Sequence, residues 1–381
     1  MRTETLLGEI ATALGRPARD PWLTALTSTP RTAFLPDTIW IRDGDGGYLM
    51  LDRTSDTEAW NAAAASDQPL VTEFTVLGDE RVPLSSASAP STVVRLLEEA
   101  GPGPGSRVLE IGTGTGFNTA LLCSVVGAGS VVTLDNVAEF SVLAGQSLRA
   151  LGHRPTVVTA DGTEGWPDRA PYSHVLATCS VRAVPSAWLE QTEPGGRIVT
   201  PWDSPWACYG TLALDRLADG SARGRFAGHG SYMLISSQRV AADLADSVEP
   251  GHTPTLGTTA LSPWEVAGAD LDAHFHIGLA VAGAWHSWDT SGEDSPVRLW
   301  IADTDGPSWA SVDWDGAQSA EFTVRQYGPR RLWDEVTAAY GWWWAQGRPA
   351  VDRYGMTVGA DGRHTSWLDS PDLAVPRTGR V

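Results

Sequence analysis

Short apolar runs alternate with helix-like segments between residues 107 and 200 of this 381-residue chain. These runs are rich in β-branched residues and end at polar or glycine-containing turns, so they predict buried strands. The predicted strands occupy residues 108–111, 130–135, 156–161 and 172–178, with a fifth that begins at residue 198. Strands and helices in alternation predict an α/β fold with a parallel, doubly wound sheet, whose ligand lies at the carboxyl ends of the strands.

The flanking regions have different patterns. Residues 1–80 are predicted to be an N-terminal helical and loop region, with helices at 4–14, 21–26 and 59–65 and a strand at 72–77. Residues 81–240 contain the alternating core. Residues 241–381 predict a mixed β/α extension, with strands at 275–281, 297–301, 308–314 and 320–325 and a helix at 331–345.

Charge and composition restrict the class of partner. The formal net charge is −19, and the only adjacent basic pair that stands out is Arg330–Arg331. A phosphate-rich substrate is therefore disfavoured, and we expect no nucleic-acid partner. No apolar run approaches the length of a spanning helix, so no membrane partner is expected. Three widely spaced cysteines favour a reducing cytoplasm.

Two further features of the C-terminal region suggest binding roles. Eleven of the 18 tryptophans follow residue 260, which predicts either a hydrophobic docking surface or well-packed aromatic core. His274 and His276 would share one face of the strand predicted at 275–281. A third metal ligand is not evident nearby, so we predict no metal site.

A glycine-rich turn follows the first core strand. Gly112, Gly114 and Gly116 let backbone approach a ligand closely, and the next helix would point free N–H groups at it. A dinucleotide fingerprint requires glycine where this chain has Phe117. By itself the turn is as consistent with a tight loop as with a nucleotide site.

Other polar residues also end core strands. Asp135 lies 23 residues after Gly112, where this architecture places a carboxylate on ribose hydroxyls, and Asp161–Gly162 and 178–180 end later strands. Together with Glu110 ahead of the turn, the pattern resembles motif I of the class I S-adenosyl-L-methionine (SAM) methyltransferases. The predicted SAM-binding residues are Glu110, Gly112, Thr113, Gly114, Thr115, Gly116, Asn118, Asp135, Asn136, Asp161 and Gly162.

A serine-rich segment, residues 84–91, precedes an amphipathic run. One interpretation is a helix N-cap with proline in the first turn. The other places serine hydroxyls beside a substrate carboxylate, where they hydrogen-bond it.

Several motifs, in order and at matching spacing, resemble the protein L-isoaspartate O-methyltransferase family over about residues 80–235. They are Ser86-Ala-Ser-Ala-Pro90, Val108-Leu-Glu-Ile-Gly-Thr-Gly-Thr-Gly-Phe117, Asp161-Gly162, Gly165-Trp-Pro167, Ala170-Pro-Tyr172, Ala177-Thr-Cys-Ser180 and Pro194-Gly-Gly196. The resemblance implies a class I, Rossmann-like core that uses SAM to methylate a carboxylate. It assigns Ser88 to the substrate side, Asp161 and Gly162 to adenine, and Thr178 to the loop bordering the substrate.

The chain departs from the family at three places. Ser91 stands where histidine is common, Thr178-Cys-Ser-Val181 stands where Thr-Ala-Ala-Pro is usual, and the family's repair enzymes end near residue 235. The long form resembles actinobacterial methyltransferases of lanthipeptide or graspetide maturation. That resemblance implies a modified precursor peptide as partner, with an aspartate esterified and converted to aspartimide. Repair of isoaspartyl proteins is the alternative.

The proposed chemistry needs few residue types. A carboxylate is ionised at neutral pH, because its pKa is about 4. Methyl transfer to it therefore needs no general base and no metal, only alignment and dry surroundings. The candidate catalytic residues are hydroxyls that hold the carboxylate: Ser86, Ser88, Thr178 and Ser180.

Overall fold

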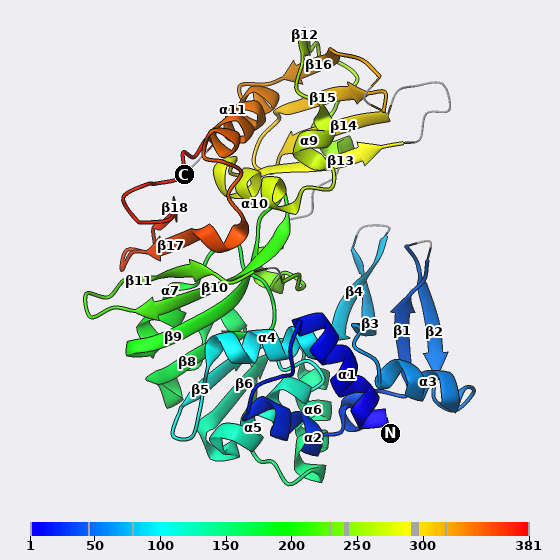
Figure 1. Cartoon of the computed structure of the whole chain (residues 1–381), viewed down its shortest axis with the longest axis vertical. Coiled ribbons are helices and arrows are strands. Elements are labelled where there is room, and N and C mark those ends of the chain that lie inside the picture. The colour runs from blue at the N-terminus through cyan, green and yellow to red at the C-terminus, as the bar shows by residue number, and fades with distance from the viewer. Residues whose placement is uncertain are drawn as a thin grey trace. The chain divides into compact units, whose positions relative to one another are not determined.

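The computed structural model describes residues 2–44, 46–77, 80–228, 230–239, 244–290, 297–316 and 318–379. The chain forms two compact units (Figure 1). The first comprises Met1–Cys179, Pro185–Thr200 and Ala213–Ala222, and the second Ser180–Val184, Pro201–Leu212 and Arg223–Val381. The division into regions 1–80, 81–240 and 241–381 stays a prediction about their separate roles.

The core of the first unit is a parallel sheet in the order β9-β8-β5-β6-β7. Its strands are β5 (Val108–Ile111), β6 (Val131–Asp135), β7 (Thr156–Thr159), β8 (Tyr172–Ala177) and β9 (Thr192–Asp203). Helix α4 (Pro90–Ala100) precedes β5, and α5 (Phe117–Val126), α6 (Ala138–Ala150) and α7 (Ser186–Gln191) connect β5 to β6, β6 to β7 and β8 to β9 (Figure 1). The predicted doubly wound, Rossmann-like α/β core is confirmed.

The N-terminal part contains more strand than the sequence predicted. Helices α1 (Arg2–Leu14), α2 (Trp22–Ser28) and α3 (Thr57–Ala64) occur as expected, and the single predicted strand is part of β3 (Leu70–Leu77). Strand β3 belongs to a four-stranded sheet in the order β2-β1-β3-β4. The other strands of this sheet are β1 (Thr38–Arg42), β2 (Tyr48–Asp52) and β4 (Glu80–Ala87). The serine-rich segment therefore begins on a strand rather than in a loop.

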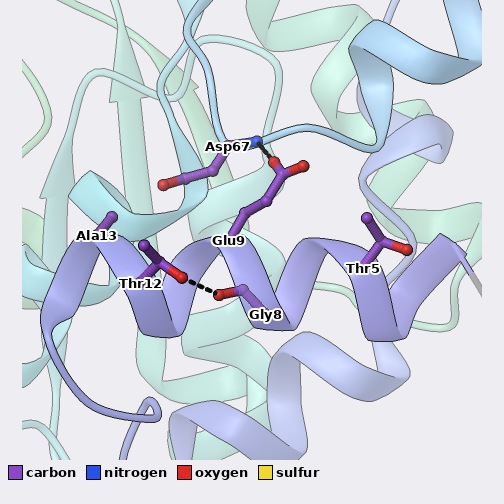
Figure 2. Close-up of a pocket in the computed structure, with 6 residues that line it drawn as sticks. All are labelled: Thr5, Gly8, Glu9, Thr12, Ala13 and Asp67. Carbon is purple, nitrogen blue, oxygen red and sulfur yellow. Dashed lines mark hydrogen bonds between the residues drawn. The ribbon is translucent and has the colours of Figure 1, made fainter.

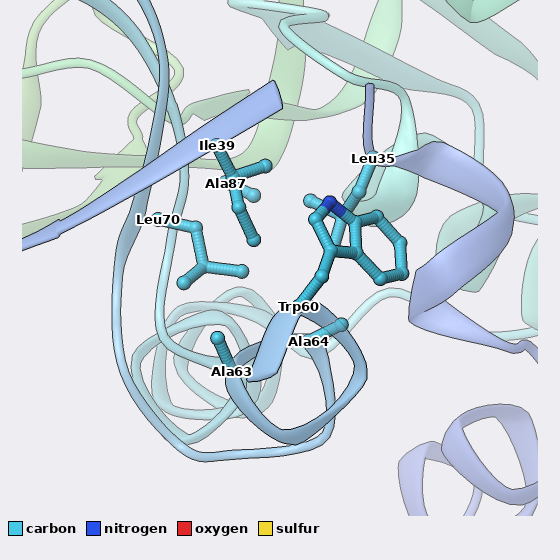
Figure 3. Close-up of a cluster of buried hydrophobic side chains, with 7 residues drawn as sticks. All are labelled: Leu35, Ile39, Trp60, Ala63, Ala64, Leu70 and Ala87. Atoms are coloured by element: carbon cyan, nitrogen blue, oxygen red, sulfur yellow. The ribbon is translucent and has the colours of Figure 1, made fainter. Parts of the chain in front are cut away.

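A small apolar cluster holds this sheet against helix α3 (Figure 3). Trp60 is fully buried at its centre, and its indole N–H donates to the carbonyl of Pro36 at 3.2 Å. The surrounding side chains are Leu35, Ile39, Ala63, Ala64, Leu70 and Ala87. Because Ala87 ends β4, the cluster fixes the strand end from which Ser88 emerges.

The second unit contains a five-stranded antiparallel sheet in the order β12-β16-β15-β14-β13. Its strands are β12 (Thr255–Thr259), β13 (Ala284–Asp289), β14 (Val297–Asp303), β15 (Trp309–Trp314) and β16 (Phe322–Tyr327). Helices α8 (Leu244–Ser247), α9 (Pro263–Ala267), α10 (Leu271–Ala280) and α11 (Leu332–Ala345) belong to the same unit. Strand β10 (Cys208–Arg216) is divided between the two units, whereas β17 (Tyr354–Val358), β18 (His364–Leu368) and all of β11 (Ala222–Phe226) except Ala222 belong to the second.

The strand predicted at residues 275–281 is wrong, because residues 275–280 belong to helix α10 and Val281 is its C-cap. Asp270 caps this helix by accepting from the N–H groups of Asp272 and Ala273. The helix is buried nearly all round, so it lacks the polar face that would have shown a helical period. His274 and His276 bond different partners, the Gly268 carbonyl and the Tyr354 hydroxyl. The described residues contain no group of three or more His, Cys, Asp or Glu side chains that could hold a metal ion.

The tryptophans of α11 divide between core and surface. Trp343 is 1% exposed, whereas Trp344 is 55% exposed. Most of the other tryptophans pack against aromatic neighbours. Within the described segments, we find no helix with the length and apolar character that crossing a membrane requires.

Candidate functional site

The glycine turn between β5 and α5 has a backbone that other residues adopt only with strain. The φ angles of Gly112, Gly114 and Gly116 are 94°, 50° and 92°. The N–H groups of Gly112 and Thr113 donate to the Leu134 carbonyl at 2.8 and 2.9 Å, which fastens the turn to β6. The Thr113 and Thr133 hydroxyls share a hydrogen bond of 2.7 Å beneath it. Thr115 completes the turn and is half-buried.

Thr178 closes the turn from the neighbouring strand. Its hydroxyl lies 2.5 Å from the Gly112 carbonyl and 3.2 Å from that of Ile111. A Cβ on Gly112 would lie 2.5 Å from that hydroxyl oxygen. The hydroxyl proton is therefore used in a bond to the glycine turn. This favours a positioning role for Thr178 over direct donation to a substrate.

Glu110 lies beneath the turn and is fully buried. Its two carboxylate oxygens accept from the Asn118 amide at 2.6 Å and the Thr119 hydroxyl at 2.5 Å. Glu110 therefore fixes the first turn of α5. Thr119 was not among the predicted site residues, although an acid in a buried strand requires donors of this kind nearby.

Asp135, at the end of β6, binds the turn from the other side. Its carboxylate accepts from the Gly114 N–H at 2.8 Å and the Val137 N–H at 3.0 Å. Burial raises the pKa of Asp135, and the backbone donors, including Asn136, oppose the rise. Each carboxylate oxygen can accept further bonds, so this side chain can also bind a hydroxyl group. The Asn136 side chain itself is exposed.

Asp161 and Gly162 stand just beyond the end of β7. The Asp161 carboxylate accepts from the N–H and hydroxyl of Thr163, both at 2.9 Å, and Gly162 is buried. The Trp188 indole donates to the Gly162 carbonyl at 2.8 Å. Trp188, which the sequence did not single out, therefore fixes this corner of the candidate site.

The remaining serines occupy different positions. Ser86 lies on β4 opposite Val71, and Ser88 lies between β4 and α4; both are half-buried. No serine caps α4: its N-cap is Ala89, with Pro90 at the first position. The N-cap interpretation of the serines is therefore wrong, while the proline part of it is correct. Ser180 belongs to the second unit, is fully buried and donates to the Tyr232 carbonyl at 3.1 Å.

A residue outside the motif supports the start of α4. Asp67 accepts from the Ser91 N–H at 2.7 Å, and its own N–H donates to Glu9 at 2.7 Å. Figure 2 shows Glu9 and Asp67 in an open pocket of about 540 Å³ along α1. Both carboxylates accept hydrogen bonds from backbone N–H groups there. These bonds link α1 to Asp67, and Asp67 to the start of α4.

The acceptors around the turn fit the SAM predicted from the motif. Asn118 Oδ1 is buried and has no hydrogen-bond partner among the residues that the structure describes. It stands beside Glu110, whose pKa the Asp135 charge also raises. A group of acceptors suits ligand donors such as an ammonium group and ribose hydroxyls.

The buried charge of Glu110 leads to a prediction about pH. Burial raises the pKa of Glu110 above its ordinary value of 4.5, while bonds from Thr119 and Asn118 lower it. The folded state then retains the proton over a range where the unfolded state has lost it, so this group destabilises the fold as pH rises through its folded pKa. We expect Glu110→Gln to gain stability relative to the wild type between about pH 5 and about pH 8.

Urea unfolding without ligand at both pH values would measure this difference. Glu190→Gln, at an exposed position, is the control and should show a constant difference. A Glu110→Gln difference that is constant or shrinks with pH would contradict the raised pKa.

Comparison with known proteins agrees with this geometry. The family model described as Protein-L-isoaspartate(D-aspartate) O-methyltransferase (PCMT) matches residues 55–238. The protein-L-isoaspartate O-methyltransferase of Thermococcus onnurineus is 35% identical over 150 residues, which are 38% of this chain and 68% of that protein. The chain belongs to this family. The corresponding protein of Ignicoccus hospitalis is 39% identical over 116 residues, 30% of this chain and 55% of that protein.

The match covers only part of the family relatives, since it spans little more than half of the Ignicoccus protein. A solved structure titled protein-L-isoaspartate O-methyltransferase resembles the fold more widely. It has a TM-score of 0.54 and 20% identity, and the likeness covers 97% of this chain and 100% of that one. The likeness of fold to that structure therefore extends beyond residue 238, where the family model ends.

Proposed function

We propose that the protein is a SAM-dependent O-methyltransferase that esterifies the free carboxylate of an L-isoaspartyl residue in a protein or peptide. The observation that carries the proposal lies within the first unit. The glycine turn, with Glu110 and Asp135 fastened to it, and the Ser86–Ser88 segment of the family motif occur in one compact unit. Family membership supports the carboxylate as methyl acceptor.

SAM is the cofactor, and it supplies a methyl group carried on a positively charged sulfur. Asp135 binds hydroxyls of the sugar, Asn118 accepts from the amino-acid end, and Asp161 and Gly162 border the base. Glu110 and Thr178 act on this ligand through the backbone and side chains that they hold. The roles of Asp135 and Asn118 follow from their acceptor chemistry and positions, and the role of Asp161 and Gly162 follows from the resemblance to the family.

On the substrate side, the chain's task is to align a nucleophile that is already ionised. Ser86 and Ser88 donate to the carboxylate and orient one oxygen toward the methyl group. A hydroxyl suits this role because it binds the carboxylate without competing strongly for the methyl group. Ser180, which donates to a backbone carbonyl, positions the segment around Tyr232.

A second candidate is methylation of an ordinary aspartate in a ribosomally made, modified peptide, followed by closure to aspartimide. Ser91 and the Thr178-Cys-Ser-Val181 loop, which depart from the family pattern, support it. Residues 241–381 would then grip the peptide, and the exposed Trp264 and Trp344, 46% and 55% exposed, are suitable contacts.

Activity on matched substrates distinguishes the two. The full-length protein with SAM is given an isoaspartyl peptide, the same peptide with aspartate, and a modified precursor peptide encoded beside its gene. Ester formation on the isoaspartyl peptide alone supports the first proposal. Ester formation on the modified precursor alone would overturn it in favour of the second.

A further inference from the structure

Arg31 is a buried residue whose role the sequence did not reveal. Its side chain belongs to the short 3-10 helix η1 (Arg31–Phe34), and the residue is 4% exposed. The guanidinium donates to four backbone carbonyls. They are those of Ser66 at 3.0 Å, Gln68 at 2.9 Å, Ala87 at 3.1 Å and Ser88 at 3.0 Å.

Two of these carbonyls belong to the candidate substrate segment, and the other two belong to the loop around Asp67. Ala87 ends β4, and Ser88 follows it directly. Ser66 and Gln68 enclose Asp67, which accepts from the Ser91 N–H at 2.7 Å. One guanidinium therefore fixes the backbone at Ser88 and also the loop that holds the start of α4.

The other end of the same 3-10 helix lies against the cofactor turn. The rings of Phe34 and Phe117 meet edge to face, with centroids 5.9 Å apart. A Cβ on Gly116 would lie 3.5 Å from the Phe34 ring. Residues 31–34 therefore join the serine segment to the glycine turn through direct contacts at both ends.

We propose that Arg31 is a positioning residue that sets the Ser88 hydroxyl relative to the bound methyl donor. The inference rests on the proposed function. Methyl transfer needs the acceptor oxygen, methyl carbon and sulfur in line, so a small shift of either anchor costs rate. Arg31 touches neither reacting group and acts through the Ser88 backbone.

Arginine is well suited to this role. Its planar fork presents several donors in fixed directions, which a lysine ammonium cannot reproduce. Burial lowers the pKa of Arg31 to about 10, and nearby Asp67 raises it, so the guanidinium is charged at neutral pH. Its Nε has no partner within the described part of the chain. The two terminal nitrogens of the guanidinium donate to the two loops beside the site.

A double-mutant cycle tests the inference with the full-length protein, SAM and an isoaspartyl peptide. Arg31→Lys should lower kcat about tenfold. In a Ser88→Ala background it should lower kcat less than about twofold further, since the positioned hydroxyl is already gone. Calorimetric SAM affinity should stay within about twofold.

Arg216→Lys is the matched control, since Arg216 also donates to backbone carbonyls, those of Leu189 and Leu217. It should leave kcat unchanged. If Arg31→Lys does not fold, Phe34→Leu tests the same helix from its other end, with the same coupling to Ser88→Ala expected.

The outcomes separate the two proposals. Suppose that the wild type is active but the losses of kcat from Arg31→Lys and Ser88→Ala are additive. That result, or an equal loss of kcat from Arg216→Lys, would overturn only the positioning role. A wild-type protein inactive on the isoaspartyl peptide would overturn the proposed function and this inference together.

Discussion

Replacing Gly112 with alanine should weaken SAM binding by about a hundredfold, because the turn cannot keep its shape with a side chain there. The φ angle of Gly112 is 94°, a conformation that costs other residues about 1–3 kcal/mol. The added Cβ would also lie 2.5 Å from the Thr178 hydroxyl oxygen, which already bonds the Gly112 carbonyl. Alanine must therefore displace Thr178 or the turn.

Calorimetric titration of SAM into both proteins would measure this loss. Gly129→Ala is the control, because Gly129 has no positive φ and a Cβ added there would meet no atom within 4 Å. Its affinity should equal that of the wild type. Tight SAM binding by Gly112→Ala would remove this turn from the cofactor site.

Ser88→Ala should lower kcat for an isoaspartyl peptide by about ten- to a hundredfold, since a hydrogen bond to a charged group is worth about 1.5–3 kcal/mol. SAM affinity should change little, because the proposed role of Ser88 is to bind the substrate carboxylate. Ser85→Ala is a close control: Ser85 is buried on the same strand and its hydroxyl accepts from Thr72 at 2.9 Å.

Steady-state kinetics with saturating SAM, together with SAM titration, separate these effects. The Ser85 variant should keep kcat within about twofold. Equal losses of turnover and SAM affinity in Ser88→Ala would place Ser88 with the cofactor instead of the acceptor.

The parallel core and its glycine turn could be predicted from the sequence because their signals are local. A buried strand, three glycines and a following helix stand within residues 108–126. Asp135 ends β6 and Asp161 lies two residues beyond the end of β7, so topology alone brings them to the same edge of the sheet.

Other features depend on contacts between distant residues. Arg31 lies 57 residues before Ser88, and no local pattern links a basic residue in a short 3-10 helix to the end of a later strand. The hydroxyl of Thr178 could be placed near the site, but only the structure shows it bonded to the Gly112 carbonyl. Helix α10 was missed because burial on all sides removed its amphipathic period.

The β1–β2 hairpin shows a third reason why part of the fold could not be predicted. Residues 38–52 contain two short strands separated by a glycine-rich segment, and such short runs predict strand only weakly. Strand β1 pairs with β2 on one side and with β3 on the other, and the Trp60 cluster packs the sheet on α3. The strand character of the Ser86 segment therefore comes from tertiary contacts.

The central claim is that this chain methylates an isoaspartyl carboxylate, and one measurement tests it most directly. The full-length protein and SAM are incubated with two peptides that differ only in an isoaspartyl or aspartyl linkage, and the products are weighed by mass spectrometry. We predict that the isoaspartyl peptide alone gains the mass of one methyl ester and then loses methanol as it closes to succinimide. Methylation of neither peptide, or of the aspartyl peptide alone, would contradict the claim.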